Sequence, residues 1–512
     1  MMDLQPAAAL GSFLTIALTI AIYRRPQTLP LPPGPKPRPL VGNALDLPHT
    51  KQFLAFDQWA KDYGDIVHIS LLGQPVIVLN SAEAVTDLLE RRSAIYSDRY
   101  HSTVVDMIGW DWNVALMCYG TRWRQIRRSL HEHFHQSASR KFQPAQVSGA
   151  RDLLFRMLQN PQNFVHDLRY VLGATILEVS YGVKAKGATD EYILIGERAV
   201  EGPTKSLVLG ALWCEFLPFL RRLPFGWPGA SFARKAVRYR GEAMDLKHTP
   251  FKKAMADMQS GTGTWSLATD VMTRDDNNDL PAKDREELAM SVAGVVYGAG
   301  ADTSFSTLET FFLAMSLYPE VQCKAQAELD VVVGSHRLPE FADQSRLPYI
   351  VAIVKECLRW QNVFTLGLPH RVMEEDEYKG YRIPKGSMVL GNVWTMTHNP
   401  EMYPEPMTFM PERYLKDGAL NPEVQDPGAF AFGFGRRACP GRHFALASIF
   451  IYAASVLHTF EIHPKKDKVG NHVEVDPTDL LHGVVSYPSK VECDIVPRSA
   501  EAAALVRNCA MQ

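Results

Sequence analysis

Apolar positions recur at intervals of three and four residues along most of the chain. Examples are the segments SAEAVTDLLERR (81–92), GARDLLFRMLQ (149–159) and SRLPYIVAIVKECLRW (345–360). This spacing gathers the apolar side chains on one face, so each segment predicts an amphipathic α-helix. The body of the chain is therefore predicted to be mainly helical.

The longest apolar stretch covers residues 284–318 and begins with four charged residues, DREE. Charged side chains in the first turn are typical of a helix start. The middle of the stretch is too polar for a membrane-spanning segment, and it is far from any flanking basic loop. We expect a long helix through the centre of a large domain.

Alternation with a period of two is confined to short regions. The segment DIVHISLLGQPVIVLN (65–80) alternates on both sides of a Gly-Gln turn, and YKGYRIPKGSMVLGNVW (378–394) also has strand character. The first predicts a β-hairpin. No long linker or repeat interrupts the chain from about Phe53 onward. We expect one large body at 46–497, mainly α with a minor antiparallel β-sheet, followed by a flexible tail at 498–512.

The N-terminus differs from this body. Ala7 to Tyr23 is apolar and uncharged, and as a helix it would span roughly 25 Å, slightly less than a bilayer core. Only Asp3 precedes it, whereas a cleaved signal peptide begins with positive charge. Arg24 and Arg25 follow it and place the rest of the chain on the cytoplasmic side. We expect residues 1–25 to form an uncleaved, single transmembrane helix that anchors the chain.

A proline-rich segment, LPPGPKPRPLVGN, follows this anchor within residues 26–45. Proline fixes φ and lacks an N–H, so the segment cannot be helical. It is predicted to be a stiff, extended hinge. A plain linker is the simpler interpretation, but rigidity this close to an anchor would also fix how the body lies against the membrane.

Composition and charge mainly argue against certain classes of protein and site. The 512 residues are 46% apolar and 21% charged, as in globular proteins. The net charge of -2 gives no argument for a nucleic-acid partner, and no nucleic-acid-binding motif is present. The seven cysteines are odd in number, scattered and without a CxxC pair. This argues against a disulfide framework and a structural zinc site, so we expect reduced thiols facing a cytosol-like compartment.

One cysteine, Cys439, lies in the segment AFGFGRRACPG (431–441). Its glycines permit a tight turn that brings backbone N–H groups close to the sulfur. The apolar segment that follows predicts a helix, whose N-terminal dipole favours a thiolate. A thiolate held in this way is suited to bind a metal. A buried cysteine in a turn would explain a bare Gly-x-Arg-x-Cys, but not the full pattern.

The segment KECLRW places Glu356 and Arg359 three residues apart, on one helix face. A solvated ion pair of little energetic value is the common explanation of such a pair. The apolar flanks predict a buried helix, however, and a buried pair needs further hydrogen-bond partners. Arg413 in FMPERYL (409–415) is a candidate.

The segment YGAGADTSFS (297–306) lies inside the long helix and contains Gly298, Gly300, Asp302 and Thr303. The two glycines weaken a helix by roughly 1 kcal/mol each against alanine. A local opening would leave room for a small ligand and a water beside the acid and the hydroxyl. A packing groove, with Thr303 bonded to its own helix, explains the segment equally well.

The segment YGTRWRQIRRSLHEHFHQ (119–136) is strongly basic. Trp123 and Arg127 are four residues apart and share a helix face. The spacing of the three histidines does not suit a metal cluster. A basic helix of this kind holds the carboxylates of a cofactor, docks an acidic partner, or is simply solvated.

Together, in this order, these segments resemble the signature set of the cytochrome P450 haem-thiolate monooxygenases. The resemblance covers the cysteine loop, ExxR, AGxDT and PERY motifs and runs from about residue 30 to about 495. The anchor and hinge resemble those of microsomal members, and LPPGPKPRPLVGN, LMCYGTRWRQIRR and AFGFGRRACPG resemble fungal members of secondary metabolism. The resemblance implies the cytochrome P450 fold, preceded by the single transmembrane helix.

The resemblance also implies a haem cofactor, with Cys439 as the axial thiolate ligand of its iron and Phe432 packed under the ring. Asp302 and Thr303 match the acid–alcohol pair that relays protons to dioxygen at the haem. Further residues match groups that bind the haem propionates: Trp123, Arg127, Arg437 and His370. Arg371, next to His370, is an alternative for the last of these. A final group matches the buried polar network of the family: Glu356, Arg359 and Arg413.

The chain has no flavin or nicotinamide fingerprint of its own, so the resemblance implies that electrons come from outside. The implied partners are an NADPH–cytochrome P450 reductase, with cytochrome b5 as a further one, and the membrane. The implied location is the endoplasmic reticulum membrane, with the catalytic domain in the cytosol. Basic residues on the cysteine side are expected to meet the acidic reductase surface: Arg122, Arg124, Arg128 and Arg442.

The substrate-contacting segments of the family correspond here to about 100–117, 295–303, 363–368 and 482–485. Their side chains are mostly apolar, and the only carboxylates that stand out as anchors for a charged substrate are Asp106 and Asp111. We therefore expect a small lipophilic substrate such as a terpenoid scaffold, with aromatic or polyketide intermediates next. The alternatives are a haem-thiolate isomerase or dehydratase that does not use dioxygen, and a membrane-tethered haem or ligand-binding protein without turnover.

Overall fold

The computed structural model describes residues 29–48, 50–207, 215, 231–274, 279–466, 473, 476, 478–481 and 483–510. The expected anchor at 1–25 lies outside these residues. In the part of the chain that is described, no helix is both long and apolar enough to cross a membrane.

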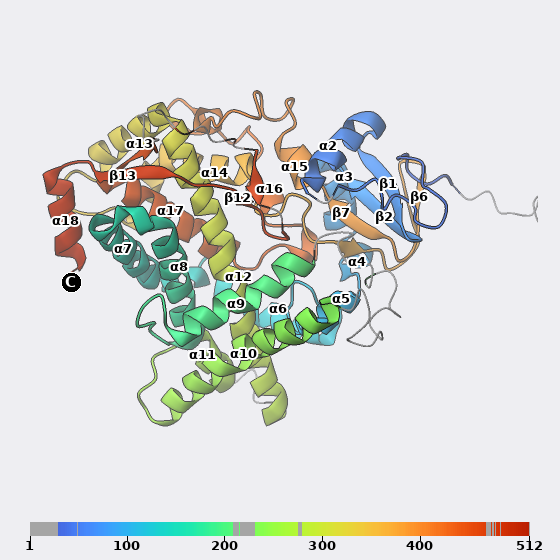
Figure 1. Cartoon of the computed structure of the whole chain (residues 1–512), viewed down its shortest axis with the longest axis horizontal. Helices are drawn as coiled ribbons and strands as arrows, with labels where there is room; N and C mark the ends of the chain where they lie inside the picture. Colours follow the sequence, from blue (N-terminus) through green and yellow to red (C-terminus); the bar gives the residue numbers. More distant parts are fainter. Residues whose placement is uncertain are drawn as a thin grey trace, which may run out of the picture.

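Helices form most of the molecule (Figure 1), as the apolar spacing predicted. Their bounds are α2 Gln52–Tyr63, α3 Ala82–Val85, α4 Ser93–Tyr96, α5 Thr103–Met107, α6 Thr121–Phe134, α7 Gln143–Gln159, α8 Phe164–Tyr181, α9 Glu191–Ser206, α10 Ser231–Gln259, α11 Leu267–Thr273, α12 Ala282–Leu317, α13 Pro319–Val332, α14 Pro348–Trp360, α15 Val393–Thr397, α16 Gly428–Ala431, α17 Arg442–Thr459 and α18 Ala500–Ala510. The predicted helix at 81–92 divides into α3 and a π-helical segment, Thr86–Arg91.

The strands are short. They are β1 Ile66–Leu71, β2 Gln74–Leu79, β3 Asp98–Arg99, β4 His370–Arg371, β5 Asp376–Tyr378, β6 Tyr381–Ile383, β7 Met388–Gly391, β8 Leu415–Lys416, β9 Ala419–Leu420, β10 Phe460–Pro464, β11 Leu480–Leu481, β12 Tyr487–Pro488 and β13 Cys493–Pro497. The largest sheet has the order β1-β2-β7-β4-β3. The predicted hairpin at 65–80 is β1 and β2, paired from Ile66 with Leu79 to Leu71 with Gln74. The minor sheet is antiparallel except between β2 and β7, which are parallel.

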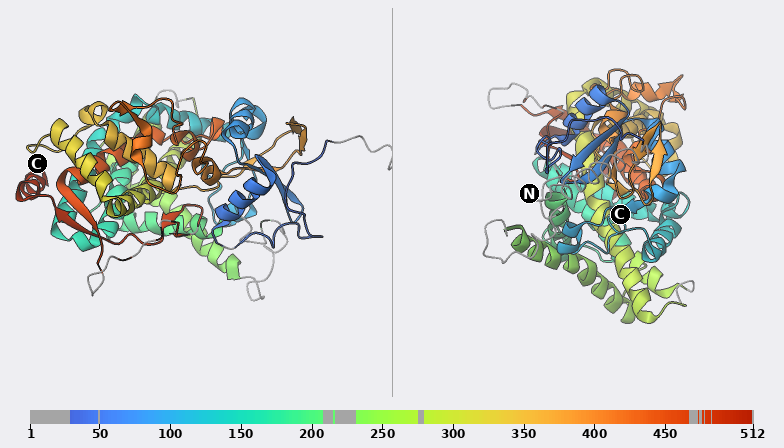
Figure 2. Two further views of the ribbon diagram at one scale, coloured as in Figure 1. Left: turned by 90° about the horizontal axis from the view of Figure 1, so that it is seen from above. Right: turned by 90° about the vertical axis from the view of Figure 1, so that its right-hand side faces the viewer.

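The long helix α12 runs through the middle of the helical part (Figure 1). It packs against α8, α10, α11, α14 and α17, and most of its residues from Leu288 to Ser316 are buried on all sides. A helix surrounded in this way carries apolar residues on every face, which explains why the sequence shows one long apolar stretch rather than a stripe. The left view of Figure 2 places the blue strands and α2 at one end of the molecule and the C-terminal helix α18 at the other.

The described part of the proline-rich segment lies against the sheet. The backbone N–H of His68 in β1 donates to the Pro33 carbonyl at 2.8 Å, and that of Arg382 in β6 donates to the Pro30 carbonyl at 2.9 Å. Gly34 is required there, because a Cβ atom at this position would lie 2.0 Å from the His68 carbonyl oxygen. The described residues of this segment are therefore attached to the body, and the chain turns back on itself where Arg38 and Gly42 bond to each other.

The prediction of a flexible tail at 498–512 is wrong for most of its length. Residues 500–510 form α18, which packs on α7, α17 and β13. Ala503 and Val506 are buried in this contact. The segment is rich in alanine, and its apolar residues recur at helical spacing, so its apolar face is covered by the body.

Candidate active site

The cysteine loop is fixed by backbone geometry. The N–H of Cys439 donates to the Phe432 carbonyl at 2.7 Å, which closes the loop between α16 and α17. Gly433 and Gly435 have φ of 72° and 53°, in the left-handed region that favours glycine. A Cβ atom at Gly435 would also lie 2.1 Å from the Leu89 carbonyl oxygen. The glycines therefore permit both the turn and its close packing on the π-helical segment.

The surroundings of Cys439 have opposite effects on the pKa of its thiol. Burial raises the pKa of its thiol, while the backbone N–H of Gly441 and the guanidinium groups of Arg127 and Arg442 act in the other direction. Burial is the largest of these effects on the pKa, so it opposes the thiolate that the helix start favours. A metal ion on the sulfur would supply the missing stabilisation.

A cavity with about 1620 Å³ of empty space, part of it open to solvent, adjoins this loop. Cys439 and Phe432 line it, and so do Gly300 and Thr303 of α12. The structure thus brings together the loop at 431–441 and the segment at 297–306, which are more than a hundred residues apart in sequence.

Arg437 is the buried cation of this cavity. Its Nε donates to the Ser97 carbonyl at 2.7 Å and its Nη1 to the Val114 carbonyl at 3.0 Å. Its Nη2 is buried without a hydrogen-bond partner, and burial lowers its pKa to about 10. A buried guanidinium nitrogen without a partner is costly, so an acceptor from a bound group fits here.

Trp123, Arg127 and His370 line the same cavity. The Trp123 ring lies 4.5 Å from the Arg437 guanidinium carbon, and its Nε1 donates to the Val114 carbonyl at 3.1 Å. Burial lowers the pKa of Arg127, and burial also holds the pKa of His370 well below its usual value. Arg127 and Arg437, together with Arg99 in the same wall, thus give this cavity three cationic side chains, which a ligand with carboxylates would suit.

The alternative to His370 is placed elsewhere. Arg371 is partly exposed, pairs with Asp98 at 3.7 Å and does not line the cavity. His370 lines it, with its Nδ1 at 2.8 Å from the Tyr96 carbonyl oxygen. Of the two neighbours, only His370 is therefore in position to reach a bound group.

Sequence analysis missed Arg99. It is buried at the cavity wall, donating from Nε to the Ala115 carbonyl at 2.8 Å and from Nη1 to the carbonyls of Leu368 and Pro369. Burial lowers its pKa to about 9. No motif marks it, because its partners come from other parts of the chain.

We expect the variant Arg437→Lys to lose bound cofactor more readily. Lysine cannot reproduce a fork that reaches two carbonyls and still offers a further donor to the cavity. Transfer of haem to an excess of an apo-globin acceptor should be about tenfold faster, since one charged hydrogen bond is lost.

The matched control is Arg436→Lys, one residue earlier. Arg436 is exposed and donates to the Tyr119 hydroxyl at 3.0 Å, outside the cavity lining. It should keep the transfer rate of the unaltered protein. Equal rates in the two variants would contradict the role of Arg437.

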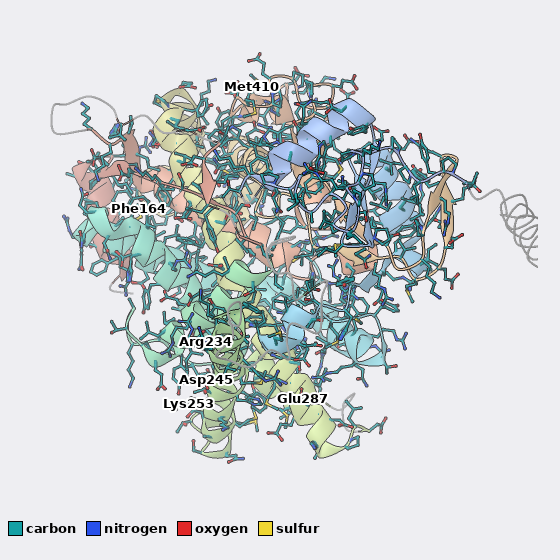
Figure 3. The ribbon with its side chains drawn as sticks, turned by 45° about the vertical axis from the view of Figure 1, so that its right-hand side comes forward. Phe164, Arg234, Asp245, Lys253, Glu287 and Met410 are labelled. Atoms are coloured by element: carbon teal, nitrogen blue, oxygen red, sulfur yellow. The ribbon has the colours of Figure 1, made fainter. Side chains whose placement is uncertain are left out.

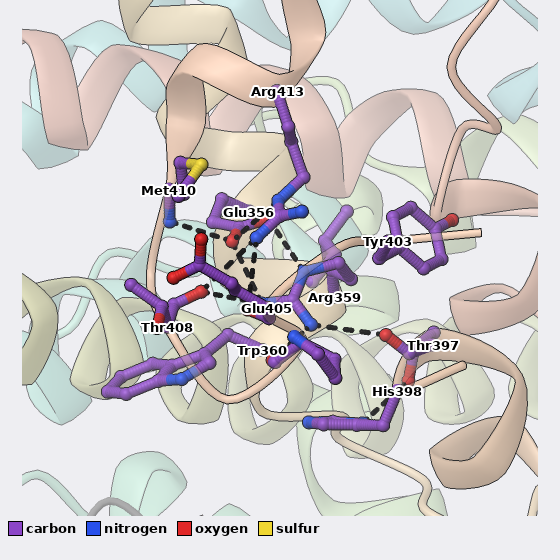
Figure 4. A network of polar contacts seen from close by, with 12 residues as sticks. Glu356, Arg359, Trp360, Thr397, His398, Tyr403, Glu405, Thr408, Met410 and Arg413 are labelled. Carbon is purple, nitrogen blue, oxygen red and sulfur yellow. Dashed lines mark hydrogen bonds and ion pairs between the residues drawn. The ribbon is translucent and has the colours of Figure 1, made fainter. Parts of the chain in front are cut away.

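A buried polar network lies between α14 and the PERY segment (Figure 4). Arg359 and Glu356 form a two-pronged pair, both distances being 2.8 Å, and both side chains are fully buried. Arg413 Nε lies 3.2 Å from Glu356 Oε1, which also accepts from the Met410 backbone N–H at 2.8 Å. Arg359 further donates to the carbonyls of Thr397, Pro406 and Thr408. The predicted pair is therefore buried, with the additional partners that a buried pair needs.

Asp302 and Thr303 are adjacent in sequence but face different cavities. Thr303 lines the cavity that contains Cys439, and its hydroxyl donates to the Ala299 carbonyl at 2.9 Å. Asp302 lines a separate cavity with about 430 Å³ of empty space. Its Oδ1 lies 2.8 Å from Arg169 Nη1, and its Oδ2 accepts from the Tyr487 hydroxyl.

The helix is not opened at this segment. It is α-helical throughout, and a Cβ atom at Gly300 would lie 2.8 Å from the side chain of Ile176 in α8. At Gly298 the nearest atom, on Trp110, would be at 3.1 Å. The glycines therefore permit close packing, which was one of the two interpretations left open by the sequence.

A second large cavity, with about 1290 Å³ of empty space, shares Arg99, Gly367 and Leu368 with the first. Segments predicted to contact substrate line it with apolar side chains: Val104, Val105, Leu116, Leu366 and Val484. Val363 and Phe364 line the first cavity, whereas Met107 and Val485 line neither. His482 lies outside the described residues.

The carboxylate in the wall of this second cavity is one that sequence analysis did not name. Glu215 lines it and accepts from the Ser102 hydroxyl at 2.8 Å and the Val104 backbone N–H at 3.1 Å. Asp106 instead faces His101 at 3.2 Å and does not line the cavity, and neither does Asp111. No sequence pattern marks Glu215, because it reaches the start of α5 from far along the chain.

The basic residues on the cysteine side are not equivalent. Arg122 forms an ion pair with Glu287, which also pairs with Lys247 of α10 at 2.5 Å. Figure 3 shows Glu287 near the start of α12, beside α10. Arg124, Arg128 and Arg442 are exposed, and among the described residues none of these three has an ion pair. Three of the four exposed cations are therefore without an ion pair among the described residues, whereas Arg122 links α6 to α12 through Glu287.

Comparison with known proteins agrees with this site. The family model for cytochrome P450 matches residues 32–489. Cytochrome P450 monooxygenase COX2 of Coprinopsis cinerea is 39% identical over 97% of this chain and 94% of its own length. Cytochrome P450 monooxygenase ple1 of Rhodocybe pseudopiperita is 41% identical over 94% of this chain and 92% of its own. Tryptamine 4-monooxygenase of Psilocybe cyanescens is 36% identical over 95% of this chain and 98% of its own.

The cofactor of this family is a haem whose iron is bound by a cysteine thiolate, and the residues present fit it. The cavity offers one cysteine sulfur, Cys439, and an unpaired guanidinium nitrogen on Arg437. Arg127 adds a second cation for the two carboxylates that haem carries. With this geometry and these relatives, the chain belongs to the cytochrome P450 family of haem-thiolate monooxygenases.

Proposed function

We propose that this cytochrome P450 inserts one oxygen atom from dioxygen into a small lipophilic substrate in fungal secondary metabolism, with a terpenoid scaffold as the first candidate. The observation that carries the proposal is the cavity shared by Cys439 and Thr303, next to an apolar cavity lined by predicted substrate segments. The apolar side chains that the predicted substrate segments contribute to these cavities favour a lipophilic ligand. An aromatic substrate is the second candidate, because one relative is named for tryptamine.

We assign the residues of the cavity as follows. Cys439 binds the haem iron, and Phe432 packs beside that sulfur. Arg437, Arg127, Trp123 and His370 bind the propionates. A thiolate-bound haem iron activates dioxygen and oxidises an unreactive C–H bond. The protein supplies orientation of the substrate, exclusion of water and delivery of protons.

Thr303 is assigned to proton delivery in the haem cavity. Its hydroxyl is fixed on the Ala299 carbonyl, which leaves its oxygen available as an acceptor and orients it in the cavity wall. Asp302 is the acid beside it. In the described conformation Arg169 and Tyr487 hold the Asp302 carboxylate, so its part in the relay requires the side chain to leave that ion pair.

We expect Thr303→Ala to uncouple NADPH oxidation from product formation. Alanine removes the hydroxyl but leaves the helix and the Arg437 site intact, so haem content should be unchanged. Product formed per NADPH should fall by roughly 100-fold, the low end of the effect of a proton-transfer group. The measurement compares NADPH consumed, hydrogen peroxide released and product formed. Tight coupling in this variant would refute the assignment.

Electrons are proposed to come from NADPH through a cytochrome P450 reductase, with cytochrome b5 as a further donor. The exposed Arg124, Arg128 and Arg442 provide the docking charges. The proposed location is the endoplasmic reticulum membrane, with residues 1–25 as the anchor and the catalytic domain in the cytosol. Arg122 is left out of the docking surface because Glu287 neutralises it.

The test has two stages. The reduced carbon monoxide complex of the purified protein should show the Soret shift that a thiolate ligand causes, and a histidine-type spectrum would refute the proposal. Expression with a reductase in a host fed terpenoids, and separately indole compounds, should then give products heavier by one oxygen atom. Conversion without dioxygen or NADPH would instead indicate an isomerase or dehydratase, and redox inertness with the reductase would indicate a binding protein.

A further inference from the structure

Tyr487 joins a wall of the substrate cavity to the central helix. It lies in β12, one residue after Ser486, and both Ser486 and Val484 line the apolar cavity. The hydroxyl of Tyr487 donates to Asp302 Oδ2. Burial raises the pKa of Tyr487, which keeps this hydroxyl protonated and able to donate. The segment at 483–488, which contains β12, is thus attached to α12 through the buried carboxylate of Asp302.

A second bond one helical turn further on reinforces the first. Ser306 donates from its hydroxyl to the Ser486 carbonyl at 2.6 Å, and both residues are buried. Asp302 and Ser306 are four residues apart, so they lie on one face of α12. The Ser486 backbone N–H in turn donates to the Val363 carbonyl at 2.9 Å. Residues 484–487 are therefore held from both sides, by α12 and by the segment at 363–368.

Arg169 of α8 fixes the carboxylate from the other side. Its Nη1 lies 2.8 Å from Asp302 Oδ1, and its guanidinium carbon lies 4.0 Å from the centre of the Phe305 ring. Each oxygen of Asp302 is therefore engaged by a different element, one by α8 and the other by β12. These bonds hold the Asp302 carboxylate in the described conformation, because they are charge-assisted.

We propose that Tyr487 is a positioning residue that sets the size selectivity of the substrate cavity, by latching the segment at 483–488 to Asp302 of α12. The inference rests on the proposed function, because it concerns the wall of the same cavity. Without the latch, Val484 and Ser486 are held only by the bonds of Ser486 to Ser306 and Val363, so they can move outward more easily, which widens the cavity. Small lipophiles then lose contacts, while larger ones gain room.

The variant Tyr487→Phe tests the latch, since it removes one oxygen atom and keeps the ring. The control is Tyr349→Phe, which removes a comparable hydroxyl bond, to Glu412 Oε1 at 2.7 Å, outside both large cavities. Backbone amide exchange of the haem-loaded full chain should accelerate by about tenfold or more at residues 483–488 in the first variant alone. Unchanged exchange in that segment overturns the proposal.

Ligand binding distinguishes a change in size selectivity of the cavity from a general loosening of the segment at 483–488. Naphthalene and pyrene serve as small and large probes, and the haem spin-state shift reports their binding. Relative to Tyr349→Phe, Tyr487→Phe should bind naphthalene about fivefold more weakly, with pyrene weakened less or strengthened. An unchanged ratio of the two affinities, or no shift with either probe in the unaltered protein, overturns the proposal. A normal thiolate-type carbon monoxide spectrum in the same samples shows that the haem-thiolate site is intact, so failure of the latch is distinguishable from failure of the proposed function.

Discussion

Replacing Cys439 with serine is expected to abolish turnover. Serine is close in size, so the loop bond from its N–H to the Phe432 carbonyl remains possible. A serine hydroxyl is a far weaker acid than a cysteine thiol, however, and burial in this loop disfavours an anion, so the serine oxygen stays protonated. The electron-rich axial ligand on which the reaction of this family depends is then missing. We expect product formation below about one thousandth of the original rate, the scale of losing a group essential to the reaction.

The measurement is NADPH-dependent product formation together with the carbon monoxide spectrum. The spectrum should lose its thiolate-type Soret shift even where haem is retained. Cys118→Ser is the matched control, because Cys118 is half-buried near the carbonyl of Arg99 but does not line the haem cavity. Its spectrum and rate should be unchanged. A thiolate-type spectrum in Cys439→Ser would mean that another cysteine binds the iron.

Features with a short local spacing were predictable from the sequence. Glu356 and Arg359 share one helix face at a spacing of three, and the apolar residues around them predict burial. In the structure both side chains are fully buried. The turn at Cys439 was predictable for the same reason, because its glycines and the following helix lie within a few residues. Short spacings determine the local backbone geometry, and the shape of these two sites depends mainly on that local geometry.

Features built from distant segments were not predictable. Arg99 reaches the Leu368 carbonyl across 269 residues, and Tyr487 reaches Asp302 across 185. In each case the local sequence resembles an ordinary surface segment, and only the fold supplies the partner. The acid of the AGxDT motif shows the limit most clearly. Its position beside Thr303 was known from the sequence, but not that its carboxylate faces another cavity and binds Arg169.

The α12 glycines show a different failure. Gly298 and Gly300 weaken a helix, so the sequence admitted a local opening. In the structure the helix stays closed, and the two glycines pack closely against Trp110 and Ile176. An alanine at either position would displace these side chains. Residues with poor helix propensity thus mark a crossing of two helices here, and intrinsic propensity is overruled by tertiary contact.

The variant Glu356→Gln is expected to cause the largest loss of stability. Glu356 carries the only negative charge that contacts Arg359 and Arg413 within the described network. Glutamine has nearly the same shape but leaves two buried guanidinium groups without a counter-charge. Removing one partner of a buried ion pair costs about 3 to 5 kcal/mol. That is a large part of the roughly 5–15 kcal/mol by which native domains are stable.

The midpoint of urea unfolding should therefore fall steeply in Glu356→Gln, and the yield of haem-loaded protein should fall with it. The haem cavity is affected because Arg359 and Arg413 hold the carbonyls of the segment at 404–408, which leads into the cysteine loop. Glu412→Gln is the control in the same PERY segment. Its carboxylate is partly exposed and pairs with Lys324 at 2.6 Å, so its loss should cost no more than about 1 kcal/mol. Equal midpoints in the two variants would show that the buried network does not hold the cysteine-loop side of the fold, and that α14 is positioned by its apolar face alone.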